Sequence, residues 1–210
     1  MKPAWRRPAF WAWLCLAGIP VDLLAWARGW TLVDPVYLGL SLLWWPVDTL
    51  GRLMALQALL RGQAPAWRRF PAALSAEVRL SLWMTGVLLA GLVPAFFVMS
   101  RVGFQSRPWL AVELGLGLLG LVPALLYSLH RLLAPLLVLE GAGAADALAG
   151  SAKRLRGRLG PFLKAWLPWM LAGLALEAAG WALPEPWSLT LTPLATAVEL
   201  VALVRGASAL

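Results

Sequence analysis

The sequence is short of charge, and it contains one histidine and one cysteine. Only 13% of its 210 residues are charged, whereas 61% are hydrophobic and the mean hydropathy is +0.75. A soluble domain is about half apolar and about a quarter charged, so this chain lacks the charged side chains that a water-facing surface needs. It also has too few polar residues for a disordered chain. These shortages exclude a soluble globular enzyme, a nucleic-acid-binding domain and a disulfide scaffold.

Residues that commonly bind metals or perform catalysis are also scarce. Cys15 lies alone within an apolar run, which excludes an internal disulfide and a thiolate metal site. A single histidine, His130, cannot form a His-rich metal cluster. The sequence has no HExxH, no GxSxG and no glycine-rich phosphate loop with a lysine. We therefore expect a protein that is not an enzyme and that takes no cofactor and no metal.

The long apolar runs predict an all-α fold, a polytopic bundle of transmembrane helices. A membrane-spanning helix needs about 20 mostly apolar residues, and we count six such segments in a single integral membrane domain over residues 1–210. The predicted spans cover residues 8–27, 35–59, 80–100, 109–129, 163–182 and 187–204. We expect the first span to remain uncleaved, although Ala25-Trp26-Ala27 loosely resembles a signal-peptidase site.

The distribution of basic residues predicts the orientation of the six spans. Cytoplasmic loops carry an excess of lysine and arginine. With the N-terminus inside, 15 of the 18 basic residues lie on the cytoplasmic side, and Arg28, Arg101 and Arg107 lie outside. The sequence therefore predicts a multi-pass membrane protein with both termini in the cytoplasm.

Two long cytoplasmic loops, residues 60–79 and 140–162, each predict an amphipathic helix in the membrane interface. Their apolar residues recur at helical spacing: Trp67, Phe70, Leu74 and Val78 in the first loop, and Leu148, Ala152, Leu155 and Leu159 in the second. Such helices place apolar side chains in the acyl boundary and cations on anionic lipid headgroups. We expect Arg68, Arg69 and Lys153 to make these headgroup contacts. The alternative is a docking surface for a cytoplasmic partner.

The second loop also carries a motif, over residues 135–158. An apolar run ends at Glu140, a glycine-rich turn follows, and Ser151 precedes a basic patch that closes with Gly157-Arg158. This pattern resembles a motif in a broad group of bacterial six-span inner-membrane proteins, which includes the membrane domain fused to some glycerophosphodiester phosphodiesterases. The loop at residues 61–79 resembles the matching earlier loop of those proteins. The resemblance implies a bacterial inner-membrane protein linked to the envelope or to lipid, and it brings no catalytic residues.

The motif has a physical interpretation of its own. Gly141 and Gly143 permit a sharp turn after Glu140. The Glu140 carboxylate can then pair with a basic residue of the following helix and hold that helix against the bundle as a latch. The candidate partners are Arg154, Arg156 and Arg158. A second interpretation makes Glu140 a carboxylate that binds a proton or a substrate.

A group of residues near the middle of the second span is the candidate binding site. Ionisable groups at membrane depth are costly and are candidates for function, and Asp48 follows Trp44, Trp45 and Pro46. A proline kink, two large aromatics and a carboxylate can line a midplane pocket. The alternative is that Asp48 pairs with Arg52, one turn along the same helix.

The sequence leaves two classes of function open. The first is a non-enzymatic accessory protein or complex subunit that acts through its helix faces and its lipid contacts. The second is a small transporter or lipid-handling protein with a midplane site around Asp48. The expected partners are a bilayer with anionic lipids and a membrane-protein partner or a second copy of the chain, and nucleic acid is not expected.

Overall fold

The computed structural model describes residues 7–29, 34–60, 66–102, 121–183 and 187–210. Within these ranges the chain is helical and contains no strand, which confirms the all-α prediction there. The α-helices are α1 (Pro8–Gly18), α2 (Pro20–Arg28), α3 (Pro35–Leu60), α4 (Phe70–Val102), α6 (Ala134–Leu139), α7 (Ala144–Leu155), α8 (Leu159–Ala182) and α9 (Leu191–Ala207). Residues 121–129 form a further helical segment, and the 3₁₀ turns are η2 (Ala66–Arg69) and η3 (Trp187–Thr190).

The first predicted span is two helices rather than one. α1 and α2 meet at Ile19 and differ in direction by 45°. Pro20 explains the break, because proline lacks a backbone N–H and its ring collides with the carbonyl four residues earlier. Gly29 ends α2 with φ of 68°, a left-handed conformation that favours glycine.

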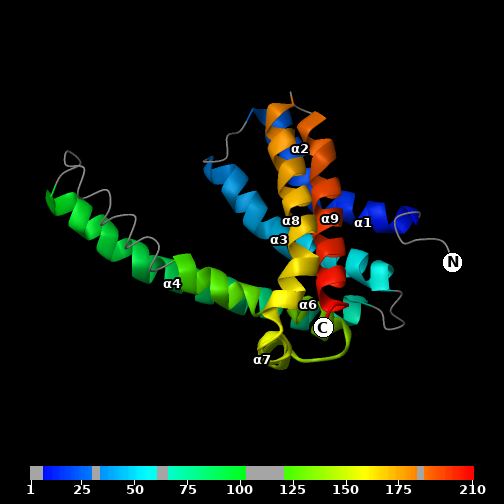
Figure 1. Ribbon diagram of the computed structural model, residues 1–210. Helices are drawn as coiled ribbons and strands as arrows, with labels where there is room; N and C mark the ends of the chain where they lie inside the picture. The colour runs from blue at the N-terminus through cyan, green and yellow to red at the C-terminus, as the bar shows by residue number, and fades with distance from the viewer. Residues whose placement is uncertain (1–6, 30–33, 61–65, 103–120, 184–186) are drawn as a thin grey trace.

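Two pairs of helices make the centre of the molecule. α8 and α9 pack along each other, and α1 packs on α3 (Figure 1). The apolar core joins both pairs through the buried side chains of Phe10, Leu14, Leu56, Phe162 and Leu200. These side chains hold the two pairs together by close packing.

The first predicted interfacial helix is not a separate element. Residues 60–79 were expected to precede a span that starts at residue 80, but α4 runs without a break from Phe70 to Val102. No residue between Pro71 and Gly86 interrupts a helix, which explains the continuity. α4 packs against the bundle through the buried Ala73 and Ala76 near its start and then runs outward, across the direction of α8 and α9 (Figure 1).

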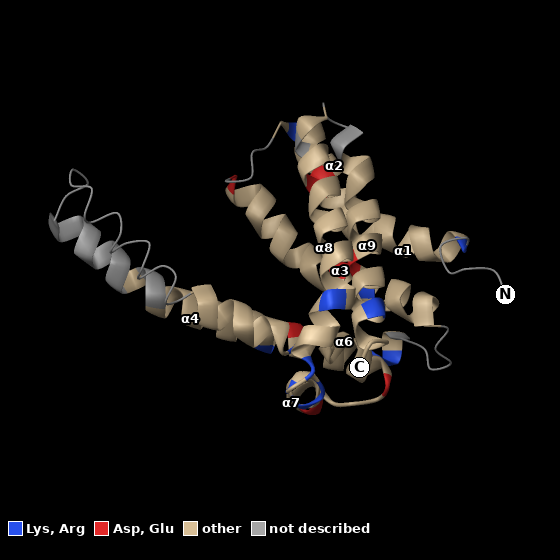
Figure 2. Cartoon of the chain, in the orientation of Figure 1, with Lys and Arg blue, Asp and Glu red and all other residues tan. Residues whose placement is uncertain are grey.

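The second predicted interfacial helix exists as α7, but its apolar side faces protein. Ala147, Leu148, Ser151 and Leu155 are buried, and α7 packs on α4 and α6. The apolar stripe therefore completes a small core with Leu137 and its neighbours rather than remaining free for the acyl boundary. Basic residues gather around α7 and the adjacent helix ends (Figure 2).

The described helices include three that are long and apolar enough to cross a membrane, or four if the bent α1–α2 pair forms one span. The three cover Trp67–Ala90, Leu121–Leu139 and Leu159–Gly180. Two predicted spans are not among them, because Asp48 and Arg52 lower the hydropathy of α3 and because α9 has 17 residues. Six spans are thus not confirmed, and residues 109–120 of the fourth lie outside the described ranges.

The contact between α1 and α3 at Gly51 gives a stability prediction. A Cβ at Gly51 would lie 2.7 Å from the Ala17 Cβ and 2.8 Å from the Trp13 carbonyl oxygen. Gly51→Ala should therefore lower the free energy of unfolding by about 1–3 kcal/mol through overpacking. Gly39→Ala is the matched control in the same helix, because nothing lies within 4 Å of a Cβ there. Thermal unfolding in detergent measures both, and equal shifts would contradict the close contact.

Candidate functional site

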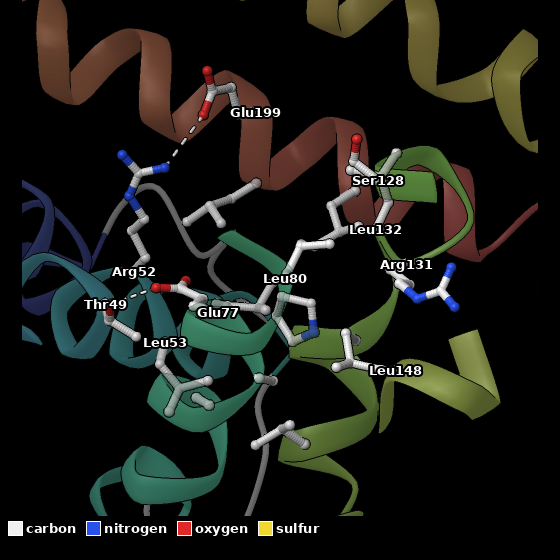
Figure 3. A pocket seen from close by; sticks show the side chains of 18 of the residues that line it. Thr49, Arg52, Leu53, Glu77, Leu80, Ser128, Arg131, Leu132, Leu148 and Glu199 are labelled. Carbon is white, nitrogen blue, oxygen red and sulfur yellow. Dashed lines mark hydrogen bonds and ion pairs between the residues drawn. The ribbon is translucent and has the colours of Figure 1, made fainter. Parts of the chain in front are cut away.

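A cavity of about 320 Å³ lies where α3, α4, α6 and α9 meet, with α8 and the turn after residues 121–129 closing its sides. Most of its wall is aliphatic or aromatic. Its polar residues come chiefly from three helices: Thr49 and Arg52 on α3, Glu77 on α4, and Glu199 on α9 (Figure 3). An apolar cavity of this size with a few converging polar groups is typical of a small-molecule site.

The contact between Thr49 and Glu77 joins α3 to α4 at one end of the cavity. Thr49 is 2% exposed, and its Oγ1 lies 2.5 Å from Glu77 Oε2 and 3.0 Å from the Trp45 carbonyl oxygen. A threonine hydroxyl carries one hydrogen, whereas the carbonyl and an ionised carboxylate are both acceptors. Both contacts can be hydrogen bonds at the same time when Glu77 is protonated and donates to Oγ1.

Arg52 joins α3 to α9 in the same polar end. Its Nε lies 3.0 Å from Oδ2 of Asp48, and its Nη1 lies 3.8 Å from Oε2 of Glu199. The side chains of Arg52 and Glu199 are 45% and 30% exposed, so they border the cavity rather than being sealed in the core. The Arg52 guanidinium thus contacts two carboxylates. Its distance of 3.8 Å from Glu199 is long for an ion pair.

Of the four residues predicted to line a midplane pocket, none lines this cavity. The Trp44 indole donates to the Ala17 carbonyl oxygen at 3.1 Å, so it ties α3 to the end of α1. Trp45 interacts through its side chain with Glu77, and Pro46 lies within an uninterrupted α3. Asp48 pairs with Arg52, as the alternative interpretation predicted. The cavity begins one residue further along, at Thr49, because that position faces α4.

Of the predicted latch residues, Glu140 and Arg154 form an ion pair, whereas Arg156 and Arg158 do not pair with Glu140. Arg154 contacts Glu140 through both terminal nitrogens, at 2.8 Å and 3.3 Å. Both side chains are more than half exposed, and exposed pairs contribute about 0–1 kcal/mol. Arg158 instead donates to the Leu210 carbonyl oxygen at 2.6 Å, and Arg156 is exposed beside the turn at Gly157.

The predicted headgroup contacts also differ from one another. The Arg69 guanidinium lies against the turn at Gly141, whose φ of 109° and limited space favour glycine. Arg68 lies 5.3 Å from the Trp67 ring centroid, and both residues are exposed together with Lys153. Arg69 is therefore partly engaged by protein, whereas Arg68 and Lys153 remain placed for a lipid surface.

Ser151 and Arg131 organise the turn beside the cavity. The Ser151 hydroxyl is fully buried, donates to the His130 carbonyl oxygen at 2.8 Å and accepts from the Leu133 N–H at 3.1 Å. Arg131 stacks on Tyr127 at 3.3 Å and extends away from Glu77 (Figure 3). Ser151 of α7 thereby fixes the turn between residues 121–129 and α6. The Arg131 guanidinium lies away from the polar end of the cavity (Figure 3).

The most informative site residue, Glu77, was missed by sequence reasoning. Glu77 lies in the segment interpreted from its sequence as a lipid-surface helix, and an exposed carboxylate is ordinary on such a helix. Its position relative to two small residues of α4 could have identified it. Glu77 follows Ala73 and Ala76, the two residues that pack α4 on the bundle, and it therefore shares their side of the helix.

Comparisons of the chain with protein-family models, curated proteins and solved structures found no match. Among the described residues, no group of three or more His, Cys, Asp and Glu is arranged to hold a metal ion.

The bond between α3 and α4 gives the second prediction. Thr49→Val keeps the shape of the side chain but leaves the Glu77 carboxyl without its hydroxyl partner, so it should cost about 1–3 kcal/mol of folding stability. Thr196→Val is the control, because the Thr196 hydroxyl likewise bonds the carbonyl four residues earlier, at 3.1 Å. Thermal unfolding of both variants in detergent measures the loss of stability. Equal losses for the two variants would show that the contact between Thr49 and Glu77 does not stabilise the protein.

Proposed function

We propose that this chain is a non-enzymatic integral membrane protein that binds a small amphiphilic molecule in the cavity between α3, α4 and α9, as a transporter or lipid-handling protein. The observation that carries the proposal is the cavity itself. It combines about 320 Å³ of space and a largely apolar wall with converging polar groups from three helices. Such a site solvates the apolar body of a ligand and orients its head.

The membrane setting of this function is part of the proposal. The excess of basic residues in the predicted cytoplasmic segments supports an inner-membrane location with both termini inside. The motif around Glu140 supports membership of the bacterial six-span group and a link to lipid. Arg68 and Lys153, both exposed, support contact with anionic headgroups.

A second candidate, an accessory subunit of a larger membrane complex, is favoured by α4. Beyond Leu80 this helix leaves the bundle, and Leu82, Leu89 and Val93 are exposed along it. Extraction in native-lipid particles followed by mass spectrometry separates the two functions. A stoichiometric protein partner would favour the subunit, and a lone protein with one enriched small molecule would favour the cavity.

The third prediction tests the cavity with a photoreactive probe, a fatty alcohol that carries a diazirine in its chain. In lipid particles the probe should label peptides that contain cavity residues such as Leu80 and Leu132. Leu80→Trp should fill the cavity and reduce that labelling at least about tenfold, which corresponds to 1.4 kcal/mol. Peptide mass spectrometry locates the label.

Leu82→Trp is the matched control, two residues along α4, where the side chain is 69% exposed. It should leave the labelling of the cavity peptides unchanged. Equal labelling in both variants, or no label at cavity residues in the unmodified protein, would sink the proposal.

A further inference from the structure

We propose that the ligand of this cavity is an amphiphilic cation, and that the cavity exchanges it for protons held by Glu77 and Glu199. This inference rests on the proposed function and adds to it the charge of the ligand. It follows from the charges at the polar end, the hydrogen bonds of Thr49 and the nature of the remaining wall.

The polar end of the cavity, together with Asp48 just outside its wall, has more carboxylates than cations. Asp48, Glu77 and Glu199 surround one guanidinium, that of Arg52, and Asp48 takes its closest contact at 3.0 Å. Glu199 is 3.8 Å from the same guanidinium, and Glu77 bonds a hydroxyl. Arg52 therefore compensates about one of the three carboxylates. Carboxylates without a counter-charge in an apolar setting either take up protons or bind a cation.

The neighbouring helices do not supply the missing positive charge. Glu177 of α8 adds to the negative field at Glu199, and Arg131, across the cavity, extends away from Glu77 and stacks on Tyr127. Among the residues that line the cavity, Arg52 and Arg131 are the basic ones. An anionic head would meet the carboxylates of Glu77 and Glu199, whereas a cationic head supplies the absent positive charge.

The contacts of the Thr49 hydroxyl favour a proton on Glu77 in the absence of the ligand. Oγ1 of Thr49 contacts two acceptors, the Trp45 carbonyl and the Glu77 carboxyl, at 3.0 Å and 2.5 Å. Its one hydrogen satisfies one of them, so the second contact is a hydrogen bond when Glu77 donates. A proton on Glu77 therefore satisfies both contacts, whereas an ionised Glu77 takes the Thr49 hydrogen and leaves the Trp45 carbonyl without it. Loss of this proton leaves a carboxylate in the cavity wall that has two neutral partners, the Thr49 hydroxyl and the Trp45 side chain.

The exchange balances charge and protons at each step. In the proposed cycle, Glu77 and Glu199 hold protons before the cation enters. When a cation enters, these carboxyls release protons to water, and the resulting carboxylates pair with the cationic head. The apolar body of the ligand then contacts the aliphatic part of the wall, which includes Leu132 and Leu148 across the cavity from Glu77 (Figure 3).

The fourth prediction compares two photoreactive probes with the same diazirine chain in lipid particles. One bears a trimethylammonium head, which is a permanent cation, and the other a hydroxyl head. The cation should bind about tenfold or more tightly than the alcohol at neutral pH. Its affinity should rise with pH by up to about tenfold per unit for each proton released, while the affinity of the alcohol stays flat.

Two sets of variants assign the effect to the named carboxyls. The double variant Glu77→Gln and Glu199→Gln should bind both probes with the affinity of the alcohol and lose the pH dependence. Glu140→Gln, which removes a carboxylate outside the cavity, should behave as the unmodified protein. If the double variant does not fold, each single variant should still flatten the pH dependence in part.

The outcomes separate this inference from the proposed function. Labelling of cavity peptides by both probes with equal affinity would overturn the cation inference and leave the cavity function standing. A cation preference that survives in both Gln variants would also overturn it. Labelling of cavity residues by neither probe would overturn the proposed function and the inference together.

Discussion

The need to find partners for the polar side chains of α3 shapes the centre of this protein. α3 places Asp48, Thr49 and Arg52 within about one turn of an otherwise apolar helix. Their partners come from α4 and α9, so these two helices must approach the same side. On its other side α3 meets α1 at Gly51, where no side chain separates the two backbones. One helix is thus fixed from two directions, by polar contacts and by close packing.

Two ion pairs that the sequence suggested as alternatives are present in the structure. Asp48 and Arg52 are four residues apart on one helix, whereas Glu140 follows α6 and Arg154 lies 14 residues later, in the last turn of α7. Such pairs depend on helix periodicity and on the glycines that bend the chain, both of which can be read from the sequence. The helical nature of the described chain follows likewise from its apolar runs.

The cavity could not be predicted, because it depends on how distant segments pack. Glu77 and Thr49 are 28 residues apart, and their contact depends on how α4 packs against α3. The apolar pattern of residues 60–79 is the same for a lipid-surface helix and for the start of a buried one. The apolar side of α7 contacts protein because α4 and α6 pack against it. The sequence of α7 alone does not reveal these two neighbours.

α4 is one continuous helix of 33 residues that connects the cavity to a point far outside the bundle (Figure 1). A helix rises about 1.5 Å per residue, so Glu77 lies about 10 Å from the start of α4 and about 38 Å from its far end. The fulcrum is the packing of Ala73 and Ala76 on the bundle, beside the Thr49 contact. A small tilt at this fulcrum becomes a much larger displacement at the far end. A small displacement at the polar end of the cavity would therefore be larger at the far end of α4.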